Sequence, residues 1–115
     1  LSGKYNVPEV PKGCRFGDYH YHDNPRQRAM ADRFVNEGTL AATAKYLEIA
    51  KEAGMSPVTL ATAWSMNFDF VASTIIGART AAQLEESLAA LDVTLSDEVM
   101  KQCDEVHKLI PYPMG

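Results

Sequence analysis

The stretch over residues 71–88, VASTIIGARTAAQLEESL, constrains the fold of this chain more than any other part of the sequence. Its first part, residues 71–76, is short, apolar and rich in β-branched residues, and it stops at Gly77, which predicts a β-strand. Thr80 then offers a side-chain cap, and Gln83 follows three residues later, which is the pattern of a capping box. The sequence therefore predicts a strand that leads through a tight turn directly into a helix.

A strand, a glycine and a capped helix together form a geometry that binds anions. The first N–H groups of a helix have no partner within the helix, and they carry a partial positive charge. Arg79 adds a full positive charge in the same turn, and Gln83, Glu86 and Ser87 share one helix face because they are three and four residues apart. The chemistry that fits is recognition of an anionic cofactor such as a nucleotide.

The rest of the chain is typical of helices joined by short connections, after an irregular loop over residues 1–24 that is interrupted by prolines and glycines. Helices are predicted over residues 25–36, 40–53, 57–67, 81–91 and 96–110, with caps at Asn24, Thr39, Ser56, Thr80 and Ser96. The apolar residues expected in the core include Trp64, Met55, Met66, Met100, Val99, Cys103 and Val106.

One predicted strand cannot satisfy its own backbone hydrogen bonds. The strand over residues 71–76 is apolar on both faces and flanked by helices, which is typical of a parallel β/α sheet. The chain alone is therefore expected either to pack as a helical domain or to pair with strands of another chain. An unpaired strand would favour homo-oligomers.

Composition excludes several classes of function. The chain has 115 residues and a formal net charge of −4, which suits one domain and argues against nonspecific binding to nucleic acid. No apolar run reaches the roughly 18 residues of a transmembrane helix, and no signal peptide is visible. The two cysteines, Cys14 and Cys103, lie far apart and suggest reduced structural thiols in a cytoplasmic protein.

His20, His22 and Asp23 resemble part of a metal site, but no further ligand has a convincing spacing, and we predict no bound metal. The alternative is a mobile loop that contains aromatic residues. The chain begins with Leu1 rather than methionine, and we interpret it as a fragment of a longer protein.

The segment around Arg79 also carries a family resemblance. It resembles the cofactor motif I-I-G-A-R-T-x-x-Q-L-x-E-N of the aldo-keto reductases, with Ser87 in place of the final asparagine. Further similar segments are LSGKY at residues 1–5, PKGCR at residues 11–15, residues 47–64 and residues 96–113. The subgroup it is most similar to is the bacterial NADP-dependent reductases that are themselves similar to potassium-channel β subunits.

This resemblance implies an α/β fold, the last part of a (β/α)8 TIM barrel that is mostly helical in this chain and has one β-strand at residues 71–76. The whole chain, residues 1–115, would be a single C-terminal segment of that barrel. It would comprise a cofactor and substrate loop (1–24), helices (25–67), strand eight with the cofactor-binding helix (71–91), and the C-terminal helix (96–110).

The resemblance further implies that NADP(H) is the cofactor and that a small carbonyl compound is the substrate. The implied cofactor-binding residues are Lys4, Arg15, Gly77, Arg79, Gln83, Glu86 and Ser87. Among these, Lys4 would lie near the pyrophosphate, Arg15 would close over the cofactor from its loop, and Arg79 would pair with the 2′-phosphate. No catalytic residue is expected here, because the family's Asp, Tyr, Lys and His tetrad lies upstream.

The chain would then be the NADP-binding part of a reductase of aldehydes or ketones, inactive without the remainder of the barrel. Two alternatives stay open at this point. The chain could be a stand-alone nucleotide-binding or regulatory interaction module, or an inactive fragment with a rearranged helical fold.

Overall fold

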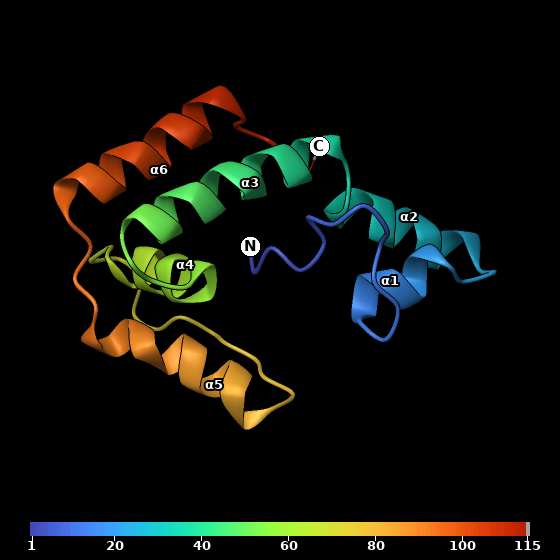
Figure 1. The fold of residues 1–115 in the computed structure, drawn as a ribbon, viewed down its shortest axis with the longest axis horizontal. Coiled ribbons are helices and arrows are strands. Elements are labelled where there is room, and N and C mark those ends of the chain that lie inside the picture. The colour runs from blue at the N-terminus through green and yellow to red at the C-terminus, as the bar shows by residue number, and fades with distance from the viewer. Residues whose placement is uncertain (115) are drawn as a thin grey trace.

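The computed structural model describes residues 1–114 as a set of helices without a sheet (Figure 1). The elements in chain order are α1 (Arg15–His20), α2 (Pro25–Phe34), α3 (Glu37–Glu52), α4 (Pro57–Met66), α5 (Ala81–Leu88), the 3-10 helix η1 (Ala89–Asp92) and α6 (Asp97–Leu109). No helix within residues 1–114 is long and apolar enough to cross a membrane.

The core lies between α3, α4, η1 and α6, and α3 and α6 run side by side across it (Figure 1). Small residues allow this close packing, because Ala42 and Ala50 of α3 and Ala63 of α4 bring the helix backbones together. The buried residues of this core cluster are Ala42, Ile49, Ala50, Leu60, Ala63, Ala90, Leu95, Cys103 and Val106. Cys103 and Val106 of α6 are therefore in the core, as their spacing predicted. Trp64 and Met66 were also expected in the core, but they are 37% and 41% exposed, so that prediction is wrong.

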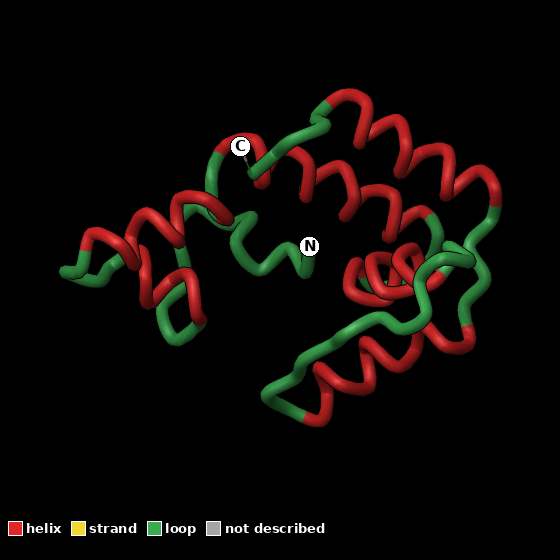
Figure 2. Tube along the Cα trace, turned by 180° about the vertical axis from the view of Figure 1, so that it is seen from behind, coloured by secondary structure: helices red, strands yellow, loops and turns green. Residues whose placement is uncertain are grey.

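The predicted β-strand at residues 71–76 is absent, and no residue between 1 and 114 is in a strand. The segment runs back alongside α5 without a partner (Figure 2). Ile75 is 97% exposed, so this chain leaves its side chain uncovered, and Ile76 is 39% exposed. A strand requires a ladder partner, and the described part of the chain supplies none. The prediction of an α/β chain with one strand is therefore wrong for the chain as it stands.

Local cap signals place most helix starts correctly. The side chains of Asn24, Ser56 and Ser96 each accept a backbone N–H at the start of their helix, as predicted. The start of α3 differs, because Asn36 is its cap, and Thr39 is the third helical residue of a capping box with both bonds at 3.0 Å.

Helices α1 and α2 pack against each other as an arm beside the core (Figures 1 and 2). Residues 15–20 were expected to be irregular, but they form α1. Aromatic contacts stabilise this helix: the Phe16 ring stacks on Phe34 with centroids 4.8 Å apart, and the Tyr5 hydroxyl accepts the Phe16 N–H at 3.2 Å. These contacts join residues distant in sequence, which is why local pattern did not reveal the helix.

Candidate cofactor site

The turn before α5 is fixed by two hydrogen bonds that involve Gln83. The Thr80 hydroxyl oxygen accepts the Gln83 N–H at 3.3 Å, as the cap predicted. The Gln83 side-chain oxygen reaches back to accept the Arg79 N–H at 2.9 Å, one residue earlier than in a standard capping box. The backbone of Arg79 is therefore held in place, while its guanidinium is exposed to solvent.

The space in front of this turn is open. A methyl group at Gly77 would meet no atom within 4 Å, and the φ of Gly77 is not positive. This chain alone therefore gives no packing reason for glycine at the position. The N–H groups of Ala81 and Ala82, in the first turn of α5, have no carbonyl within the helix to bind. The turn thus combines open space, free N–H groups and one arginine, which fits an anionic ligand.

Glu86 and Ser87, the other two predicted residues of α5, are less exposed than Arg79 and Gln83. Ser87 is only 8% exposed, and its hydroxyl donates to the Gln83 carbonyl at 3.1 Å. Glu86 is half-buried, and its backbone carbonyl accepts a hydrogen bond from the Thr59 hydroxyl at 2.8 Å. The single hydroxyl proton of Ser87 is thus already used within α5, which leaves only its oxygen as an acceptor.

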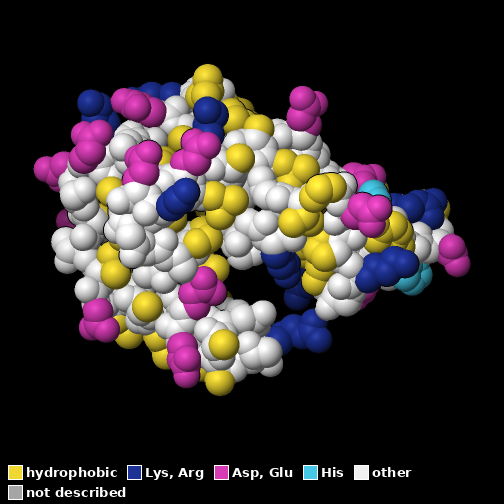
Figure 3. All heavy atoms as spheres, in the orientation of Figure 1, with side chains coloured by type: hydrophobic (Ala, Val, Ile, Leu, Met, Phe, Trp, Pro, Cys, Tyr) yellow, Lys and Arg dark blue, Asp and Glu magenta, His cyan; other side chains and the backbone are white. Residues whose placement is uncertain are grey.

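Lys4 and Arg15 line a cavity that includes no residue of the turn before α5. Both are exposed at the edge of a cavity of about 760 Å³ between the N-terminal segment, α1, α3 and the C-terminal tail. Figure 3 shows Lys and Arg side chains around the hollow on this face of the molecule. Lys4 Nζ is 5.0 Å from the centre of the Tyr5 ring. The seven predicted cofactor residues therefore form two groups, residues 4 and 15 at this cavity and residues 77–87 at α5.

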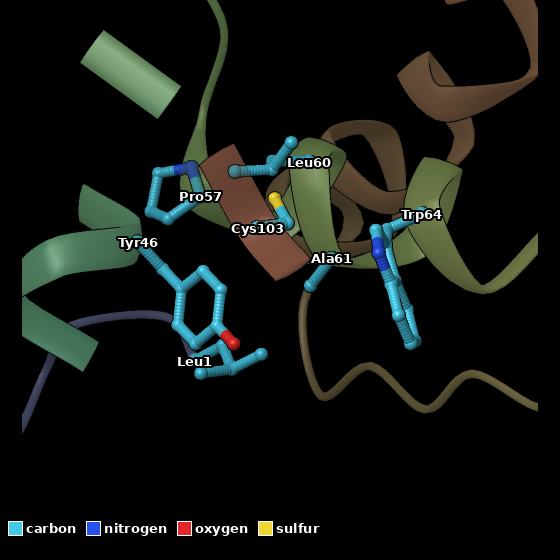
Figure 4. A pocket seen from close by; sticks show the side chains of 7 residues that line it. All are labelled: Leu1, Tyr46, Pro57, Leu60, Ala61, Trp64 and Cys103. Atoms are coloured by element: carbon cyan, nitrogen blue, oxygen red, sulfur yellow. The ribbon is translucent and has the colours of Figure 1, made fainter. Parts of the chain in front are cut away.

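A smaller, apolar pocket of about 100 Å³ was not predicted from the sequence. In Figure 4, Tyr46 and Leu1 lie on one side of it and Trp64 on the other, with Cys103 between α4 and α6. Burial raises the pKa of the Cys103 thiol, and the neighbouring Asp104 raises it further. This pocket has no charged side chain in its lining and offers no chemistry for an anionic cofactor.

His20 and His22 each contact a neighbouring residue of the chain. His22 Nδ1 accepts the Asn24 N–H at 3.0 Å, and the His20 ring packs edge-on against Tyr21 with centroids 4.9 Å apart. Within residues 1–114, no three His, Cys, Asp or Glu side chains are grouped so that they could hold a metal ion. Cys14 and Cys103 are both free thiols.

The sequence model of the aldo/keto reductase family matches residues 12–108, which is most of the chain. The chain belongs to the aldo/keto reductase family. This confirms the resemblance inferred from the motif around Arg79.

Several curated aldo/keto reductase relatives are similar along nearly the whole chain. Protein Tas of Escherichia coli is 37% identical over 98% of this chain, and L-glyceraldehyde 3-phosphate reductase of the same organism is 30% identical over 91%. A probable voltage-gated potassium channel subunit beta of Arabidopsis thaliana is 32% identical over 81% of the chain. The chain covers 30%, 29% and 26% of these three relatives, respectively, so it spans less than a third of their length.

Proposed function

We propose that this chain is the C-terminal, NADP-binding part of an aldo/keto reductase that reduces aldehydes or ketones with NADPH. The observation that carries the proposal is the turn over residues 77–80, where Arg79 precedes the capped N-terminus of α5 in a segment that matches the family. Membership of a reductase family supports the reaction class, and one of the relatives is named as a reductase.

Each residue of the turn has a distinct role in this proposal. Arg79 pairs with the 2′-phosphate, because a guanidinium binds phosphate through a planar fork of donors. The N–H groups at the start of α5 favour the same negative charge. Gln83 holds the Arg79 backbone, and Gly77 leaves room for the nucleotide. NADPH, when bound, supplies the hydride that reduces the carbonyl carbon.

The remaining predicted residues are assigned to other parts of the cofactor. Lys4 is assigned to the pyrophosphate, and Arg15 to a loop that closes over the cofactor. Glu86 contributes its side chain at the adenosine end, and Ser87 contributes only its hydroxyl oxygen as an acceptor, because its proton is donated to the Gln83 carbonyl. The catalytic tetrad belongs to the upstream part of the barrel.

The unpaired segment favours this assignment over a stand-alone nucleotide-binding module. Ile75 is almost fully exposed, although apolar β-branched residues are usually buried. The preceding barrel strands of the proposed reductase would cover this segment. The isolated chain is therefore expected to lack reductase activity, and the small carbonyl substrate would bind where the upstream part completes the pocket.

The test measures binding of NADPH and NADH to the reductase, meaning this chain together with the residues encoded upstream of it. Fluorescence titration is expected to show tighter binding of NADPH. A charge-assisted contact is worth about 1.5–3 kcal/mol, so Arg79→Ala should weaken NADPH binding by roughly 10- to 100-fold and leave NADH binding nearly unchanged. Equal affinities for the two cofactors, or no loss in Arg79→Ala, would overturn the proposal.

A further inference from the structure

The only buried polar residues between positions 1 and 114 lie at the contact of α4 with α5. They are Thr59, which is 5% exposed, and Ser87, which is 8% exposed. Burial of a hydroxyl is unfavourable unless it is hydrogen-bonded. The Thr59 hydroxyl meets this requirement by donating to the backbone carbonyl of Glu86, which is 27 residues away in sequence, at 2.8 Å.

The direction of every hydrogen bond at Thr59 is fixed. A carbonyl can only accept, so the one hydroxyl proton of Thr59 goes to Glu86. The Ser56 hydroxyl lies 3.0 Å from the Thr59 hydroxyl and must therefore donate to it. The Ser56 oxygen in turn accepts the Thr59 N–H at 3.0 Å as the cap of α4. These bonds form one continuous relay from the start of α4 to the last turn of α5.

We infer that Thr59 is a positioning residue for the 2′-phosphate contact of Arg79, and this inference rests on the proposed function. Glu86 lies in the last turn of α5, whereas Arg79 lies just before the N-cap Thr80. Ala81 and Glu86 are about 7.5 Å apart along the helix, and Arg79 lies beyond Ala81. A tilt of α5 by about 10° about Glu86 therefore displaces the start of the helix, and Arg79 with it, by about 1–2 Å. A bidentate contact does not tolerate such a shift.

Substitution of Thr59 by valine keeps the shape of the side chain and removes the donor. The Glu86 carbonyl and the Ser56 hydroxyl then each lose a buried partner, and α5 relaxes to recover one. Thr59→Val is expected to raise the Kd for NADPH about five- to tenfold, within the range of one lost buried hydrogen bond. The Kd for NADH, which meets Glu86 and Ser87 at its adenosine end but has no 2′-phosphate for Arg79, should rise by a smaller factor than the Kd for NADPH. Thr59→Ser restores the donor and should restore NADPH binding.

Thr62→Val is the matched control. Thr62 lies on the same helix, and its hydroxyl donates at 2.8 Å to the Val58 carbonyl within α4, so it does not join α4 to α5. This variant should bind both cofactors like the wild type. Circular dichroism melts of all variants show whether weaker NADPH binding reflects a displaced Arg79 or a loss of folding.

A double-mutant cycle with Arg79→Ala decides the inference. If Thr59 acts through Arg79, then Thr59→Val has no further effect on NADPH binding once Arg79 is alanine. An undiminished effect in that background, or an equal loss of NADH binding, would overturn the positioning role and leave the proposed function intact. A failure of Arg79→Ala itself to weaken NADPH binding would instead overturn the proposed function.

Discussion

Gly17 in α1 provides a sharp test of the packing that holds the arm together. Gly17 is buried, and a methyl group on its Cα would overlap the Pro11 carbonyl oxygen and lie 2.8 Å from the Pro11 carbonyl carbon. The same oxygen accepts a hydrogen bond from the Cys14 thiol at 3.0 Å, so it is not free to move away. Gly17→Ala should therefore push α1 off the preceding loop.

Two opposing effects determine the size of this change. Alanine in place of glycine within a helix stabilises that helix by up to about 1 kcal/mol. Overpacking of a site that cannot relax costs about 1–3 kcal/mol. The clash involves backbone rather than a flexible side chain, so the upper part of this range applies. We expect a net destabilisation of the arm by about 1–2 kcal/mol. Because α1 packs on α2 rather than on the core helices, the loss should be local.

Hydrogen exchange followed by mass spectrometry measures this local loss. Amides of α1 should exchange about 5- to 30-fold faster in Gly17→Ala, while amides of α3 keep their wild-type rates. Gly77→Ala is the matched control, since a methyl group there meets nothing within 4 Å and the backbone φ is not positive. Unchanged or slower exchange of α1 in Gly17→Ala would refute the reasoning.

Two further predictions concern the core. Leu60 is 3% exposed in the buried cluster, so Leu60→Ala should lower the free energy of unfolding by about 2–4 kcal/mol in urea titrations; a loss below 1 kcal/mol would contradict this packing. Burial and then Asp104 raise the pKa of Cys103, so its thiol ionises at lower pH in the unfolded chain than in the folded chain. The contribution of Cys103 to the free energy of unfolding should be fully present below the ordinary thiol pKa and should be lost as pH rises through the raised pKa of the folded chain. Cys103→Ala should therefore flatten the pH dependence of thermal stability in melts from pH 7 to 10.

The sequence predicted best those features that depend on neighbouring residues. A cap needs only a short polar side chain and an N–H two or three residues later, which is why Asn24, Ser56, Thr80 and Ser96 were found. The same rule failed at α3 because two residues three apart both suit a cap. The structure uses Asn36 as the cap and Thr39 as its reciprocal partner.

Features that depend on residues distant in sequence could not be predicted from local patterns. Helix α1 is stabilised by contacts of Phe16 with Tyr5 and Phe34, and both of these partners lie outside the helix. Thr59 carries no local signal either, because a threonine within an apolar helix has many roles. Its functional interest appears only through a partner 27 residues later. The motif predicted Arg79 and Gln83 as cofactor-binding residues, but it gave no sign of Thr59, which we propose positions α5.

The pattern over residues 71–76 predicted both an extended backbone and pairing in a sheet, and these two predictions have different outcomes. Its β-branched residues favour an extended backbone, and the segment is indeed free of helix. Within this chain, a side-chain bond of 2.8 Å from Thr74 to Ser65 ties it to α4. Its pairing, by contrast, depends on backbone partners that this chain does not contain in its described part. Under the proposed function those partners come from the upstream barrel, whereas the turn at Arg79 is held by hydrogen bonds among Arg79, Thr80 and Gln83 of this chain. The turn that we propose to bind the 2′-phosphate is therefore the part of the site that this chain builds by itself.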